Sequence, residues 1–145
     1  MDPLSIISLV EACSNFSFTI GKLIIALTNL ANTFKQVAFT INVFTNECKT
    51  IAAVITRLQD WINSQVDKNN VDAKIWDQLR ETIELGELVV AAFEEELRPI
   101  SDLGAVIGFR KKSRAAWALS TLKEHQDRVR GQFSGLTLLL LIVNL

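Results

Sequence analysis

The sequence is poor in the residues from which catalytic and metal sites are usually built, with two cysteines and one histidine in 145 residues. Cys13 and Cys48 have no Cys-x-x-Cys or Cys/His spacing, which excludes the usual zinc motifs and a disulfide framework. Both fall at apolar-face positions of helical patterns, so we expect buried, reduced thiols. His125 stands among the charged residues of 123–127, and we expect it on the solvent side of its helix.

Motifs for catalysis are missing as well. The chain has no Gly-rich phosphate loop and no Gly-x-Ser-x-Gly elbow. Three consecutive carboxylates, Glu94 to Glu96, fan around a helix and do not converge as a general acid/base pair would. We therefore expect no enzymatic activity, no cofactor, no metal site and no small-molecule substrate.

The chain also lacks an excess of charge and any long apolar run. Its 15 basic and 16 acidic residues give a net charge of -1, with no aromatic-rich basic groove, so a nucleic-acid partner is not expected. The longest uniformly apolar run, 138–143, is far shorter than the roughly 18 residues of a constitutive transmembrane helix. The amino terminus opens with Asp2 and has no basic region of a secretory signal. These absences favour a cytoplasmic location at rest.

Helical periodicity is what the sequence does contain. Apolar residues recur in steps of three and four through three long segments, the pattern of helices that bury one face. The three stripes are Val37, Ile41, Phe44, Cys48, Ile51, Ile55, Leu58 and Ile62; Leu79, Ile83, Gly86, Val90, Phe93 and Leu97; and Leu119, Leu122, Gln126, Val129, Phe133, Leu136, Leu140 and Val143. No alternating strand pattern occurs. We expect an all-α fold, an up-and-down bundle of four long helices in one domain, at about residues 3–31, 34–66, 71–98 and 113–143.

Individual residues refine these helices. Pro99 is expected to end the third helix at Arg98, because a proline disfavours helical geometry in the residue before it. Gly86 lies on the third stripe, where a missing side chain lets a neighbouring helix approach closely. Gln126 is the one polar break in the fourth stripe. The spacing does not decide whether the first helix is continuous or broken near Ser14 to Ser17.

The first segment differs from the other three, because its apolar residues are not confined to one stripe. A helix that is apolar nearly all round is either surrounded by other helices or in lipid. The residues assigned to this candidate membrane-active helix are Leu4, Ile6, Ile7, Leu9, Val10, Glu11, Phe16, Phe18, Ile20, Gly21, Ile24 and Leu27. We expect the helix to be part of the core in the resting domain. The same segment can be core in one state and inserted in a membrane in another.

Two charge runs oppose the dipoles of their own helices. Glu94 to Glu96 lie near the end of the third helix, and the basic run lies at the start of the fourth. The basic run consists of Arg110, Lys111, Lys112 and Arg114. The two runs can face each other across the connection, or the basic run can contact anionic lipid headgroups.

The connection between these helices is too apolar for a plain solvated loop. It contains the candidate partner patch, Leu103, Val106, Ile107 and Phe109. Such a segment either tucks against the end of the bundle or binds a partner.

The two ends of the chain resemble a known family. The opening Met1-Asp2-Pro3-Leu4-Ser5-Ile6 runs directly into a weakly charged apolar helix, and long heptad-like helices follow. Near the other end, Arg110-Lys111-Lys112 leads to Trp117-Ala118-Leu119, a charged segment and a leucine-rich close. In these features the whole chain resembles the HeLo-like amino-terminal domain of fungal NLR-like STAND proteins.

The resemblance implies a helical-bundle cell-death or signalling domain attached to a nucleotide-binding oligomerisation module. Relatives of this kind are thought to release the amino-terminal helix on oligomerisation and to permeabilise the plasma membrane. The implied partners are anionic membrane lipids and further copies of the chain, and the implied location changes from cytoplasm to plasma membrane on activation.

The chain departs from that family at its first helix, which is richer in phenylalanine and carries Glu11. An ionised carboxylate at the bilayer centre costs about 2.5 to 3.5 kcal/mol on insertion scales. Insertion would therefore need an oligomer that shelters Glu11 around a water-filled pore. The alternative interpretation is a passive helical interaction or oligomerisation module that does not contact lipid.

Overall fold

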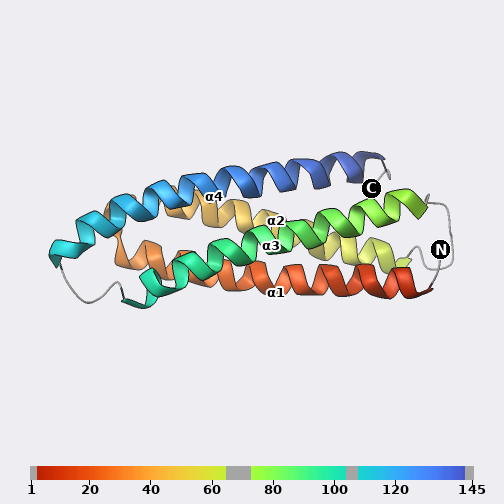
Figure 1. The fold of residues 1–145 in the computed structure, drawn as a ribbon, viewed down its shortest axis with the longest axis horizontal. Helices are drawn as coiled ribbons and strands as arrows, with labels where there is room; N and C mark the ends of the chain where they lie inside the picture. Colours follow the sequence, from red (N-terminus) through yellow and green to blue (C-terminus); the bar gives the residue numbers. More distant parts are fainter. Residues whose placement is uncertain (1–2, 65–72, 104–107, 143–145) are drawn as a thin grey trace.

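The computed structural model of the chain is built from four long helices (Figure 1). It describes the chain except residues 1–2, 65–72, 104–107 and 143–145. Helix α1 spans Pro3–Thr33, α2 spans Ala38–Ser64, α3 spans Ala73–Leu103 and α4 spans Gly108–Ile142, with a short 3-10 helix η1 at Lys35–Val37. No strand occurs in the described ranges, and the predicted all-α four-helix bundle is confirmed.

The helices run alternately in opposite directions along an elongated bundle (Figure 1). Helix α1 lies between α2 and α3 and contacts both, whereas α4 packs mainly on α3 and touches α2 little. The start of α1 and the end of α4 therefore lie at the same end of the bundle (Figure 1).

Helix α1 is continuous, which settles the question of a break near Ser14 to Ser17. It ends at a turn fixed by Phe34, whose backbone N–H donates to the carbonyl of Leu30 at 2.8 Å. Phe34 has φ -110° and ψ 80°, outside the helical region, and its ring is buried. This non-helical residue and η1 place the start of α2 at Ala38, four residues after the predicted start.

The predicted stripes of α2 and α3 form the core. Every residue of the α3 stripe is buried, and so is the α2 stripe from Ile41 to Ile62. In α4, Leu122, Gln126, Val129 and Leu136 are buried, while Phe133 and Leu140 are half-buried. The step of three and four residues thus identifies the buried side of these helices, although each also exposes some large apolar side chains: Phe39 and Val43 on α2, Leu85 and Leu88 on α3, and Leu138 and Leu141 on α4.

The predicted boundary between the third and fourth helices is wrong. Helix α3 continues through Pro99 to Leu103, and α4 begins at Gly108 and not at 113. A proline removes one backbone hydrogen bond, to the carbonyl four residues earlier. That residue is Glu95, which is exposed, so water can bind the freed carbonyl and the helix tolerates the loss.

Candidate functional site

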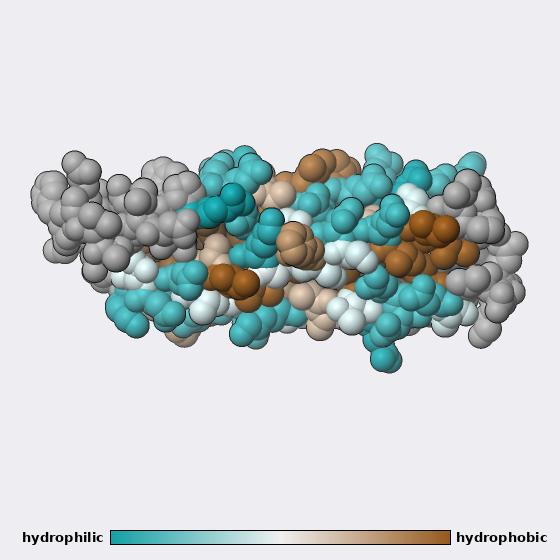
Figure 2. Space-filling model, turned by 90° about the horizontal axis from the view of Figure 1, so that it is seen from below, coloured by the Kyte–Doolittle hydropathy of each residue, from teal (hydrophilic) through white to brown (hydrophobic). Residues whose placement is uncertain are grey.

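Helix α1 buries one side in the bundle and leaves three separated apolar side chains in solvent, here called its exposed stripe. The exposed fractions of Ile7, Phe18 and Ile25 are 54%, 68% and 63%. Spacings of eleven and seven residues are close to whole turns of a helix, so the three side chains share one face. Seen from below the view of Figure 1, hydrophobic side chains form separate patches divided by hydrophilic ones (Figure 2). The resting domain therefore exposes part of the apolar surface of α1.

The residues assigned to the candidate membrane-active helix divide into three groups. Leu9, Phe16, Ile20 and Leu27 are buried; Ile6, Val10, Gly21 and Ile24 are half-buried; Ile7, Glu11 and Phe18 are exposed. The side chain of Leu4 lies outside the described residues. By length and composition, Ile6–Thr33 could cross a membrane, although the core helix of a soluble protein has the same properties.

Two side-chain hydrogen bonds tie α1 to its neighbours. The hydroxyl of Thr19 donates to Oε1 of Glu87 on α3 at 2.8 Å. On the other side, the amide of Gln59 on α2 donates to Oγ of Ser14 at 2.9 Å. Among the described residues these are the two side-chain bonds to α2 and α3, so most of the contact that retains α1 is apolar packing, which is not specific to one neighbour.

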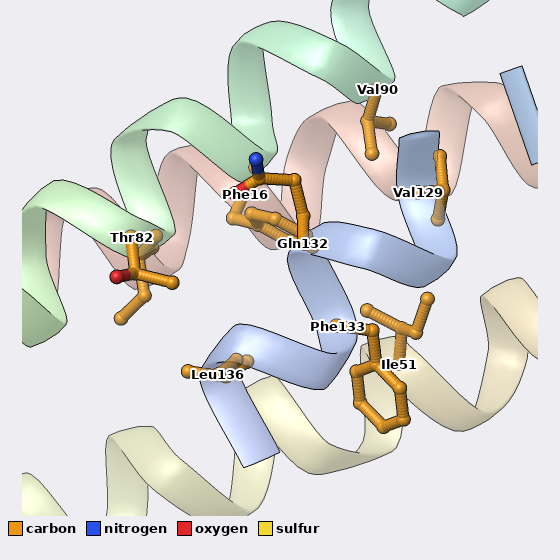
Figure 3. Close-up of a pocket in the computed structure, with 10 residues that line it drawn as sticks. Phe16, Ile51, Thr82, Val90, Val129, Gln132, Phe133 and Leu136 are labelled. Atoms are coloured by element: carbon orange, nitrogen blue, oxygen red, sulfur yellow. The ribbon is translucent and has the colours of Figure 1, made fainter. Parts of the chain in front are cut away.

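Phe16 packs closely against α3 at Gly86. A Cβ built on Gly86 would lie 2.7 Å from Cε2 of Phe16, so the predicted close approach at this glycine is confirmed. The ring borders a small apolar cavity of about 20 Å³ enclosed by all four helices (Figure 3). The cavity is lined also by Ile51, Val90 and Leu136. An apolar space of this size stays dry.

His125 is buried, with an exposed fraction of 2%, which corrects the predicted solvent position. Its ring stacks on Phe93 with centroids 4.5 Å apart and an interplanar angle of 8°. Its Nε2 lies 2.9 Å from Oε2 of Glu96, while Nδ1 has no partner in the described part of the chain. The physical reason is its spacing, three residues after Leu122 and four before Val129, which places it on the buried side.

The acidic run pairs locally in the structure. Glu94 is buried and accepts two hydrogen bonds from the guanidinium of Arg98 one turn later, and Glu96 contacts His125. Each of these two carboxylates thus has a partner within the described residues. The side chains of the basic run lie outside the described residues, so its predicted pairing with the acidic run stays a prediction.

The basic run and the candidate partner patch are placed only in part. Arg110, Lys111, Lys112 and Arg114 lie in the first two turns of α4, and their side chains lie outside the described residues. Leu103 ends α3 and Phe109 is the second residue of α4, with side chains also outside that range. Val106 and Ile107 lie wholly outside it.

A polar cluster joins α4 to α2. Glu47 accepts hydrogen bonds from Nε of Arg130 at 3.1 Å and from the amide of Gln126 at 3.3 Å. The Arg130 hydrogen bond is the main reason that the pKa of the Glu47 carboxyl lies below its ordinary value. Gln126, the one polar break in the fourth stripe, thus has a hydrogen-bond partner on α2.

The Glu47 cluster gives a pH-dependent prediction. Because its folded pKa is below the ordinary value of 4.5, the carboxylate stabilises the fold above that pH, and the contribution is lost as the pH falls through the lowered value. We expect Glu47→Gln to lower the free energy of unfolding by about 0.5 to 1 kcal/mol at pH 7 and to have no such effect at pH 2. Urea unfolding at both pH values measures this. Glu81→Gln, at an exposed carboxylate on α3, serves as the control, and an equal loss at both pH values would contradict the assignment.

The cysteines are where the sequence placed them. Cys13 and Cys48 are buried free thiols, and burial raises the pKa of each to about 12. Both are therefore protonated and unreactive at neutral pH. No group of histidine, cysteine and carboxylate side chains that could hold a metal occurs among the described residues.

Comparison with known proteins identifies no relative of the chain. No protein family, curated protein or solved structure matches the chain. The geometry of α1 and its surroundings is therefore the basis for assigning a function.

Proposed function

We propose that this chain is a helical effector domain whose first helix passes from the core of the resting bundle into a membrane when copies of the domain assemble. The observation that carries the proposal is the composition of α1. It is long and apolar enough to cross a membrane, yet in the resting fold it serves as the central helix between α2 and α3.

The exposed stripe of α1 supports the proposal. A helix that served only as core would be expected to have a polar outer face, although exposed apolar side chains occur on α2 and α3 as well. On α1 three such side chains, Ile7, Phe18 and Ile25, share one face. They provide a first contact with the hydrocarbon region before the buried side has to leave the bundle.

The resemblance to HeLo-like domains supplies the setting of the proposal. In that setting the domain lies in the cytoplasm at rest and permeabilises the plasma membrane on activation, causing regulated cell death. Arg110, Lys111, Lys112 and Arg114 are close together in sequence at the start of α4. Basic residues near an anionic membrane surface contribute about 1 kcal/mol each, so this run is the proposed headgroup contact.

Charging the exposed stripe tests the proposal without damaging the core. Phe18→Lys changes an exposed side chain, so the fold should remain within about 0.5 kcal/mol of wild type. A lysine at the centre of an inserted helix costs about 2.5 to 3.5 kcal/mol, so dye release from anionic vesicles by an oligomer-tagged domain should be largely abolished. The measurement is release against protein concentration, with and without the oligomerising tag.

Phe39→Lys is the matched control, because Phe39 is 82% exposed and lies on α2. The same substitution there should leave dye release unchanged. Equal release by the Phe18→Lys and wild-type domains, both folded and assembled, would rule out insertion of α1.

A passive interaction module is the second candidate function. It is favoured by a groove between α2 and α4, because exposed apolar surface rimmed by polar residues is typical of a protein-binding site. Under this function a folded, assembled domain causes no dye release, and reversing the four basic charges of 110–114 leaves binding of its partner intact.

A further inference from the structure

A groove of about 780 Å³ separates the second half of α2 from the end of α4. Val54, Leu58 and Trp61 line it from α2, and Leu140 lines it from α4. Arg57 and Asp60 stand beside these apolar residues and are exposed. The groove is thus an apolar surface flanked by one positive and one negative charge.

The groove exists because α2 and α4 pack loosely against each other in the described part of the chain. The Glu47 cluster joins the helices in the first half of α2, and elsewhere in the described residues the two helices touch little. Beyond this cluster α2 presents small side chains, Thr50 and Ala53, on the side of the groove. Small residues cannot fill the space between two helices, so the apolar surface there stays uncovered.

Trp61 is held in place at the groove. Its indole stacks on that of Trp76 from α3, with ring centroids 5.5 Å apart and 21° between the planes. The side chain is only half-buried, so part of the ring borders the groove. A rigid, partly exposed tryptophan loses little conformational freedom on binding and is a common anchor of protein interfaces.

The charges beside the groove are self-complementary. Arg57 and Asp60 are three residues apart on α2, and neither makes an ion pair with another described residue. A two-fold axis crossing α2 between them would place Arg57 of each copy level with Asp60 of the other. Symmetric dimers need a surface of this kind, in which each residue meets its complement on the same patch.

We propose that this groove is the contact between two copies of the chain, with the two α2 helices packed antiparallel. Two reciprocal Arg57–Asp60 ion pairs flank the contact, and Trp61 of each copy covers apolar surface of the other. The inference rests on the proposed function, in which copies of the domain assemble. It identifies the surface through which those copies first associate.

A charge-swap experiment tests the pairing. We expect Arg57→Asp and Asp60→Arg each to raise the dissociation constant of self-association about tenfold, because each places two like-charge pairs at the contact. The double variant R57D/D60R restores opposite charges and should return the constant to within about threefold of wild type. Sedimentation equilibrium of the untagged domain over a dilution series measures all four proteins.

Arg80→Asp is the matched control, since Arg80 is on α3 and pairs with the exposed Asp77 at 3.9 Å. It should not change self-association. A wild-type domain that stays monomeric at every concentration overturns the proposal, and so does a swap that fails to restore association in a domain with unchanged helicity. Dye release is measured separately, so a dimer without release contradicts the proposed function and leaves the interface standing.

Discussion

Replacing Phe93 with alanine is expected to lower the free energy of unfolding by about 3 to 5 kcal/mol, the cost of removing a large aromatic side chain from a packed core. Phe93 is fully buried on α3. Its ring lies 5.4 Å from that of Phe44 on α2 and 4.5 Å from that of His125 on α4. The substitution therefore opens a space where three helices meet, and His125 loses its stacking partner.

Urea unfolding followed by circular dichroism measures this effect. Phe39→Ala is the control, because Phe39 is 82% exposed and its removal should change the free energy of unfolding by less than about 0.5 kcal/mol. A loss at Phe93 below about 1 kcal/mol would mean that α4 does not pack on α3 through this ring.

Gly86→Leu is expected to destabilise the fold by about 1 to 3 kcal/mol, the usual cost of overpacking a core. Even a Cβ at this position would meet the Phe16 ring at 2.7 Å, and a leucine would extend further into the α1–α3 contact. The adjacent cavity of about 20 Å³ is too small to accept the displaced ring. Thermal and urea unfolding of the variant give the change in stability.

Gly21 offers a matched control on α1. A Cβ there meets nothing within 4 Å, so Gly21→Leu should not destabilise and should gain up to about 1 kcal/mol from helix propensity. Adding Phe16→Leu to the Gly86→Leu variant should recover part of its loss, because the smaller side chain makes room. Equal effects of leucine at Gly21 and Gly86 would show that the α1–α3 contact is looser than described.

The buried faces of α2 and α3 are predictable from sequence, because apolar residues at steps of three and four alternate there with charged ones. The same spacing also indicated the buried position of His125, which lies three residues after Leu122 and four before Val129. Its charged neighbours suggested the opposite face. Sequence neighbours report poorly on burial in a helix, because adjacent side chains point about 100° apart.

The outward face of α1 could not be assigned from sequence. With apolar residues all round the helix, no pattern separates Phe16, which is buried, from Phe18, which is exposed. The predicted end of the third helix at Arg98 was wrong for a different reason. Proline is unfavourable within a helix but does not forbid it, and the exposure of Glu95 decides how much the missing hydrogen bond costs.

The position of α1 between α2 and α3 also determines what its departure would require. A helix at the edge of a bundle could swing out while the other three kept their core, as a lid opens. Departure of the central helix would instead uncover the apolar stripes of α2 and α3 together. Such a three-helix remnant would expose both apolar stripes to water, which is unfavourable. The remnant would have to be covered by lipid or by other copies at the moment of release.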